Sequence, residues 1–308
     1  MSSWFEPDYL KDFHCKAGSC RHTCCDGWEI QVGELEYFRL IGMDCSDELH
    51  HRLEIAFSIP EQPTAEAYRV IRPNWLGRCP MLSDEGLCLL QMECGADALP
   101  SICRFYPRSF RKEGDYQRAV CSGSCEAVIE LLMRLDRLTF HQQEDHERPL
   151  ISEPVDDEYP AICRHCLQTI QDRSTTMRER IACVTETVGC KAKVTPEIVE
   201  AMLPTLLELS PELKPYLHDT SECNDQDQPW EENLLANHML FVDFPYTDRR
   251  IAKADSAIGL MVCYELMQML KGNRGDALVD GLSALFHLTE HTAFYYNAKL
   301  LYERMAQH

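Results

Sequence analysis

Apolar positions in the second half of the chain recur at helical spacing. The segment 195–209 begins with Thr195, which can cap a helix, and has a proline at the first helical position. Leu203, Leu206 and Leu207 continue its apolar stripe. The same kind of pattern predicts helices at 230–241, 249–270 and 277–305, with a glycine-containing turn at 272–276 between the last two.

The first half of the chain mixes short elements with turns. Residues 46–57 have Leu49, Leu53 and Ala56 on one helical face, which predicts a helix. Residues 108–120 are typical of a β-hairpin with its turn at 113–115, and a helix is expected at 124–138. The fold class predicted is therefore mainly α, with a short hairpin in the N-terminal region and a helical C-terminal domain.

A charged segment with three prolines, 144–160, interrupts these patterns and is typical of a linker. Eleven of the 17 cysteines precede it, between Cys15 and Cys125. We therefore expect a cysteine-rich, metal-binding domain at 1–142, a linker at 143–160 and a helical domain at 161–308.

Composition narrows the classes of partner. The 308 residues carry a formal net charge of −20, which repels phosphate backbones and anionic lipid, so nucleic acid and membrane are not expected partners. Residues 1–11 lack the basic and apolar regions of a signal peptide, and the apolar stretch 258–264 is too short to span a bilayer. We therefore expect a cytoplasmic protein whose cysteines are thiols.

The N-terminal cysteines form the pattern that carries chemistry. Four lie within eleven positions beside charged residues, which disfavours simple core packing. Converging thiolates select zinc, copper(I) or iron–sulfur clusters. Paired Cys-x2-Cys knuckles, usual in structural zinc sites, are absent from this region, which favours iron only modestly. The single Cys-x2-Cys, Cys163 to Cys166, lies in a helical stretch with Cys183 and Cys190 further on, and we expect core cysteines there.

Several of these motifs resemble a known family. Residues 13–28, with cysteines at 15, 20, 24 and 25, resemble the opening of the flagellin lysine-N-methylases. The resemblance continues through 79–88, 99–108 and 124–126, and more loosely through 232–241 and 289–291. The cysteine motifs also occur in a broader family of proteins that chelate zinc or iron through cysteine clusters. A non-enzymatic chelator is therefore the competing hypothesis.

The resemblance implies an enzyme that transfers methyl groups from S-adenosylmethionine to lysine side chains of flagellin and carries a [4Fe–4S] cluster, with zinc as the alternative metal. More positions match the family's cysteine pattern than one cluster needs. Cys45, Cys94 and Cys121 are additional here. The matching positions, expected as metal ligands, are Cys15, Cys20, Cys24, Cys25, Cys79, Cys88, Cys103 and Cys125.

Residues for the cofactor and for catalysis are less marked. No glycine-rich turn follows a strand, which disfavours a doubly wound methyltransferase domain. Arg108, with Tyr106 nearby, is a candidate for pairing with the cofactor's carboxylate, and the alternative is an arginine that stabilises the turn after Pro107. Glu290 and His291 are candidates for the base that deprotonates lysine, and the alternative is a helix-surface position. His238, His287 and His291 lie on helical faces, where structural histidines are common.

Overall fold

The computed structural model describes residues 3–25, 29–113, 116–144, 158–218 and 226–306. The chain divides into two compact units. The smaller unit is Cys15–Tyr106, and the larger unit combines Met1–His14 with Pro107–His308. This division differs from the expected boundary at 143–160, because the segment after residue 107 packs with the C-terminal helices. Most of the expected linker and the hairpin turn fall on 145–157 and 114–115, outside the described residues.

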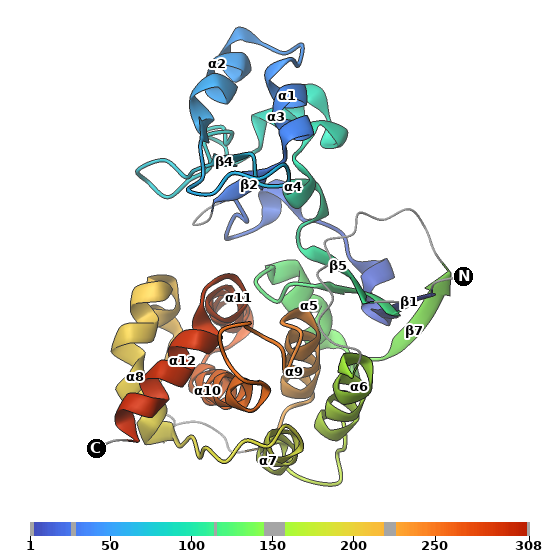
Figure 1. Ribbon diagram of the computed structural model, residues 1–308, viewed down its shortest axis with the longest axis vertical. Coiled ribbons are helices and arrows are strands. Elements are labelled where there is room, and N and C mark those ends of the chain that lie inside the picture. Colours follow the sequence, from blue (N-terminus) through green and yellow to red (C-terminus); the bar gives the residue numbers. More distant parts are fainter. Residues whose placement is uncertain (1–2, 26–28, 114–115, 145–157, 219–225, 307–308) are drawn as a thin grey trace. The chain divides into compact units, whose positions relative to one another are not determined.

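The smaller unit is built from short elements around a small apolar core (Figure 1). The predicted helix at 46–57 is confirmed: Ser46 caps it by accepting a hydrogen bond from the Leu49 N–H, and Leu49 and Leu53 are buried. Its sheet has the antiparallel order β2-β4-β3. Its elements are η2 (Ala17–Ser19), β2 (Ile30–Val32), α1 (Glu34–Ile41), α2 (Asp47–Ala56), β3 (Phe57–Ser58), β4 (Arg69–Ile71), α3 (Leu89–Cys94), η3 (Ala96–Ala98) and α4 (Ser101–Phe105).

The larger unit contains a four-stranded sheet of order β5-β6-β1-β7. The predicted hairpin is confirmed as β5 (Arg108–Glu113) and β6 (Tyr116–Cys121). The pattern did not predict β1 (Ser3–Pro7), which pairs parallel to β6, or β7 (Phe140–Glu144), which pairs antiparallel to β1. These strands are short, and only long-range pairing brings them together.

Helices make up the rest of the larger unit, which confirms the mainly helical fold (Figure 1). The helix expected at 277–305 is wrong as a single element: it is interrupted at Thr292, whose backbone is extended. The break lets the last helix turn back and pack on α8 and α10. The remaining elements are η1 (Asp8–Asp12), α5 (Glu126–Arg134), α6 (Tyr159–Ile170), α7 (Met177–Thr187), α8 (Pro196–Leu209), η4 (Pro211–Tyr216), α9 (Pro229–Phe241), α10 (Lys253–Leu270), α11 (Gly275–His291) and α12 (Phe294–Met305).

Helix α9 is buried on nearly every side, although it carries many polar residues. Glu232 in its first turn accepts charged hydrogen bonds from Arg173 and from the buried Arg180. The side-chain amide of Asn233 donates hydrogen bonds to the carbonyls of Leu132 and Leu135 at the C-terminal end of α5. Because each buried polar group has a partner, the helix acts as a polar framework for the segments around it.

None of the described helices is both long and apolar enough to cross a membrane.

Candidate metal centre and buried polar network

Four of the predicted ligands form one group in the smaller unit: Cys25, Cys79, Cys88 and Cys103. Burial raises the pKa of the Cys103 thiol, and the other three thiols raise it further. Burial also raises the pKa of Cys88, where the backbone N–H of Gln91 opposes the shift and Cys25 adds to it. Thiolates that raise one another's pKa need a positive charge to be held together, and a metal centre supplies one.

Local structure places these four thiols. The Cys79 N–H donates to the Cys25 carbonyl over 2.9 Å, which ties the first cysteine motif to the second. A turn at Gly86, in the left-handed region at φ 78°, then lets Cys88 lie at the start of α3. Cys103 lies on α4 and packs against the apolar core of the unit. The ligand motifs are therefore loops and helix ends attached to one core.

The donor chemistry of this group, four soft thiol side chains, suits zinc or an iron–sulfur cluster. Among residues that the structure describes, no group of three or more His, Cys, Asp or Glu side chains has a geometry that could hold one metal ion.

The other predicted ligands are divided between the two units. Cys15 and Cys24 are exposed and Cys20 is partly buried, all in the smaller unit. Cys125 belongs to the larger unit, where it precedes α5 and raises the pKa of Cys121.

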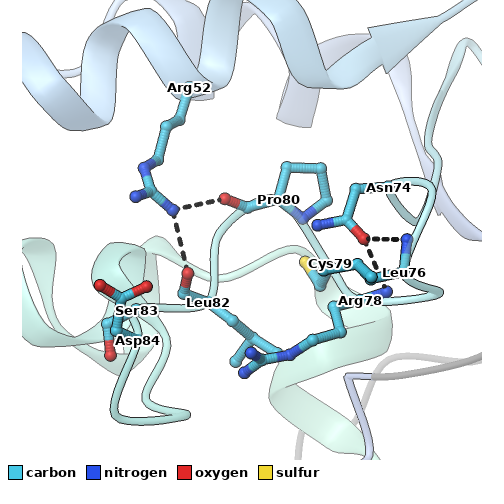
Figure 2. A pocket seen from close by; sticks show the side chains of 9 residues that line it. All are labelled: Arg52, Asn74, Leu76, Arg78, Cys79, Pro80, Leu82, Ser83 and Asp84. Atoms are coloured by element: carbon cyan, nitrogen blue, oxygen red, sulfur yellow. Dashed lines mark hydrogen bonds between the residues drawn. The ribbon is translucent and has the colours of Figure 1, made fainter.

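A pocket of about 190 Å³ borders Cys79 in the smaller unit. Figure 2 shows Arg52 reaching from α2 to the loop that carries this cysteine, where its guanidinium donates to the Pro80 and Leu82 carbonyls over 3.0 and 2.9 Å. Typical ligand pockets begin at roughly 300 Å³. This pocket is thus too small to enclose a ligand as large as S-adenosylmethionine, and Arg52 serves to fix the loop.

Arg108 lies at the start of β5 in the larger unit. Its guanidinium stacks 4.6 Å from the centre of the Phe13 ring and donates to the Phe13 carbonyl over 3.4 Å. It also lowers the pKa of Cys121, opposing the effect of burial. Tyr106 ends α4 in the smaller unit. The contacts of Arg108 therefore resemble the structural alternative more than a cofactor site.

Glu290 and His291 form a buried polar network with the segment before α5. Glu290 accepts hydrogen bonds from the Ser122 hydroxyl and the Gly123 N–H, over 2.6 and 2.9 Å. His291 Nε2 lies 3.0 Å from Ser122 Oγ and 2.8 Å from Ser124 Oγ. The helix-surface alternative is wrong for Glu290, whose side chain is fully buried.

A second histidine, His238 on α9, links Glu290 to Tyr295 and so extends this network. His238 Nδ1 lies 3.0 Å from Glu290 Oε1, and its Nε2 lies 2.7 Å from the Tyr295 hydroxyl. Both ring nitrogens are thus engaged and the side chain is fully buried, which agrees with a structural histidine. Sequence patterns could not single out Ser122 or Tyr295, because isolated serines and tyrosines carry no signature; their only signal was proximity to motifs 124–126 and 289–291. Ser124 lies inside the motif 124–126, which gave it no role of its own.

Beside this network, the neighbouring turn of α9 holds the end of β6. Tyr9 donates to the Asn237 side chain over 2.5 Å and accepts from the Cys121 N–H over 3.0 Å. Asn237 in turn donates to the Cys121 carbonyl over 2.9 Å. These bonds fix the chain on entry to the 122–125 segment, so that its two serines face α11.

Of the five described cysteines after residue 160, three belong to the core, while Cys190 is partly buried and the core expectation is wrong for Cys183. Cys163, Cys166 and Cys263 are buried, and burial raises the pKa of Cys166 to about 12. Cys183 is exposed. The core interpretation of the Cys-x2-Cys pair agrees with this burial.

Comparisons with known proteins identify distant relatives. The lysine-N-methylases of Salmonella choleraesuis (strain SC-B67) and Salmonella typhimurium (strain LT2) are each 25% identical over 151 residues, which cover 47% of this chain and 37% of the relative. The chain is a distant homologue of these proteins. The flagellar biosynthetic protein FliU of Salmonella muenchen is 26% identical over 129 residues, 42% of this chain and 75% of FliU.

These matches confirm the resemblance stated from the motifs. They cover little more than a third of the lysine-N-methylases, so most of the length of those relatives has no counterpart in the matched segment. The chain matches no family model. No solved structure matches it either.

Proposed function

We propose that this chain is a protein lysine N-methyltransferase that transfers methyl groups from S-adenosylmethionine to lysine side chains of flagellin. The observation that carries the proposal is the homology to two proteins named lysine-N-methylase and to a flagellar biosynthetic protein. The motif resemblance, which extends to 289–291 near the C-terminus, supports it. A chelator would not need the large helical unit that carries this second motif.

The proposed metal centre is a [4Fe–4S] cluster on Cys25, Cys79, Cys88 and Cys103, with zinc as the alternative. Support comes from the chemistry of four soft ligands and from their mutual effect on pKa. When bound, the positive core of the cluster would offset part of the charge of the four thiolates and join the motifs around 25, 79–88 and 103. Cys15, Cys20, Cys24 and Cys125 remain predicted ligands outside that group.

Methyl transfer places one demand on the protein itself. The lysine ammonium has an ordinary pKa of about 10.4 and no lone pair, so it must lose a proton before it reacts. A positioned general base contributes about 10²–10⁴-fold to the rate of such a step. The site must therefore offer a proton acceptor that is neutral near pH 7 and can be reached by a lysine side chain.

Mass spectrometry of flagellin co-expressed with this protein tests the function. We expect mass increments of one methyl group on surface lysines. A Cys88→Ser/Cys103→Ser variant should give less methylation, while Cys183→Ser, an exposed cysteine of the larger unit, should match the wild type. Unmodified flagellin beside metal-loaded wild-type protein would contradict the proposal and favour the chelator.

Anaerobic purification tests the metal separately. We expect brown protein with about four iron and four sulfide per chain. Colourless protein with stoichiometric zinc would instead establish the alternative metal, whatever the result with flagellin.

A further inference from the structure

The network in the larger unit has a buried end and a partly exposed end. Glu290, His238 and Ser122 are buried, whereas Ser124 and His291 are partly exposed. The His291 and Phe241 rings pack edge to face, with 5.9 Å between their centres. A side chain with an apolar stem and a polar tip can therefore approach Ser124 and His291 along an aromatic wall.

Hydrogen-bond accounting shows that the network can hold one additional proton. The single hydrogen of the Ser122 hydroxyl goes to Glu290, and Ser122 Oγ accepts from the Ser124 N–H over 3.1 Å. The one hydrogen of the Ser124 hydroxyl is then shared between a neutral His291 Nε2, 2.8 Å away, and Ser122 Oγ, 2.6 Å away. If Nε2 becomes protonated, the same bond reverses and the nitrogen donates to serine oxygen. The Ser124 hydrogen then turns to Ser122 Oγ, so that each of these close contacts contains a hydrogen.

Burial and the charges around the His291 ring favour a neutral imidazole that can still accept a proton. Burial lowers the pKa of His291, and His287 lowers it further, while the Glu290 carboxylate opposes both effects. The imidazole is therefore neutral near pH 7, and the carboxylate would stabilise the imidazolium once it forms. The titratable groups that face the Glu290–His291 pair from its own and neighbouring elements are His287, His238, Tyr295, Tyr9, Cys121 and Cys263.

We propose that His291, reached directly or through Ser124, is the proton acceptor for a primary ammonium group that binds against the Phe241 ring, Glu290 stabilising the product. Under the proposed function, on which this assignment of substrate rests, the ammonium group is that of the lysine to be methylated. Ser122 is a positioning residue, because it orients Glu290 and the 122–124 segment without needing to touch the substrate.

The proton moves without any further reactant. The ammonium N–H bond breaks, its electron pair stays on nitrogen, and the proton ends on His291 Nε2, either directly or as Ser124 takes it and passes on its own hydrogen. The neutral amine then forms a bond to the methyl carbon of the sulfonium donor, whose carbon–sulfur electron pair returns to sulfur. The imidazolium later releases its proton to solvent.

The rate of methylation as a function of pH tests the role of His291. At saturating flagellin and methyl donor, His291→Asn should lower kcat about 100-fold at pH 7. The deficit should shrink toward pH 9.5, because lysine then deprotonates without help. Ser124→Ala should lower kcat less, and His165→Asn, an exposed histidine on α6, should match the wild type. Equal kcat in His291→Asn, or a deficit that is constant at every pH, would overturn the proposal.

A second measurement does not depend on methylation. In protein labelled with ¹⁵N-histidine, the His291 resonances are identified by their loss in His291→Asn. n-Butylamine is an ammonium ion at pH 7, so its binding should shift the Nε2 resonance through a new hydrogen bond and move the titration of His291 to lower pH in the wild type, and less in Ser124→Ala. An unresponsive His291 would overturn the ammonium site even if wild-type protein methylates flagellin. A responsive His291 in protein that does not methylate would support the site and contradict the proposed function instead.

Discussion

The two units differ in how they cover their apolar side chains. In the described part of the smaller unit no helix exceeds ten residues, and large apolar side chains such as Leu35, Phe38 and Trp75 are exposed. In the larger unit, within the described residues, Leu209 alone among large apolar side chains is exposed. A chain segment with little buried apolar surface relies on other sources of stability, such as metal ligation.

The cysteines follow the same division. In the larger unit Cys121, Cys163, Cys166 and Cys263 are buried and behave as small core residues. In the smaller unit every described cysteine keeps some exposure. The same residue type therefore fills space in one unit and points to ligand chemistry in the other, and its surroundings decide which.

The largest expected effect concerns metal removal. A structural metal can contribute about 10 kcal/mol to folding. Cys88→Ser/Cys103→Ser should therefore lose metal and unfold the smaller unit, while the larger unit stays folded. Hydrogen exchange should show fast exchange across 29–106 and unchanged protection in α9 to α11. Cys183→Ser serves as the control. Equal loss of protection in both units would show that the larger unit depends on the metal as much as the smaller unit does.

A smaller effect is expected from the polar framework of the larger unit. Glu232→Gln leaves the buried Arg180 without its carboxylate partner and should lower the free energy of unfolding by about 3 kcal/mol. Urea unfolding followed by far-ultraviolet circular dichroism measures it. Glu303→Gln removes a partly exposed helix pair with Lys299 and should lower the free energy of unfolding far less, because solvent screens that pair. Similar costs for both variants would contradict a framework role for Glu232.

The smallest effect is a pH dependence of the larger unit, since a single group carries it. Because burial lowers the pKa of His291 below 6.5, the unfolded chain binds more protons than the folded chain just below that pH. The free energy of unfolding should thus fall as pH drops from 7.5 to 5.5. Urea midpoints at both values measure the fall, and His291→Asn should reduce it. An unchanged slope in that variant would assign the dependence to other groups.

Local pattern was enough to predict much of the fold. The helices around 46–57, 195–209, 230–241 and 249–270 and the hairpin at 108–120 follow from apolar spacing and turn residues, which act over a few positions. The break at Thr292 could not be predicted this way. Residues 277–305 continue an acceptable helical pattern, and the packing of α12 on α10 and α8 opposes a single straight helix.

By itself the sequence determined which residue types are available for chemistry: the clustered thiols, and the Glu290–His291 pair. Only the tertiary structure decided which of them meet. It brings Cys25 beside Cys79, Cys88 and Cys103, and it places Ser122 and Ser124 against a pair almost 170 positions later. Periodicity reports which face of an element is buried. It carries no information on which distant element covers that face, because that choice depends on shape and on pairing buried polar groups across the whole core.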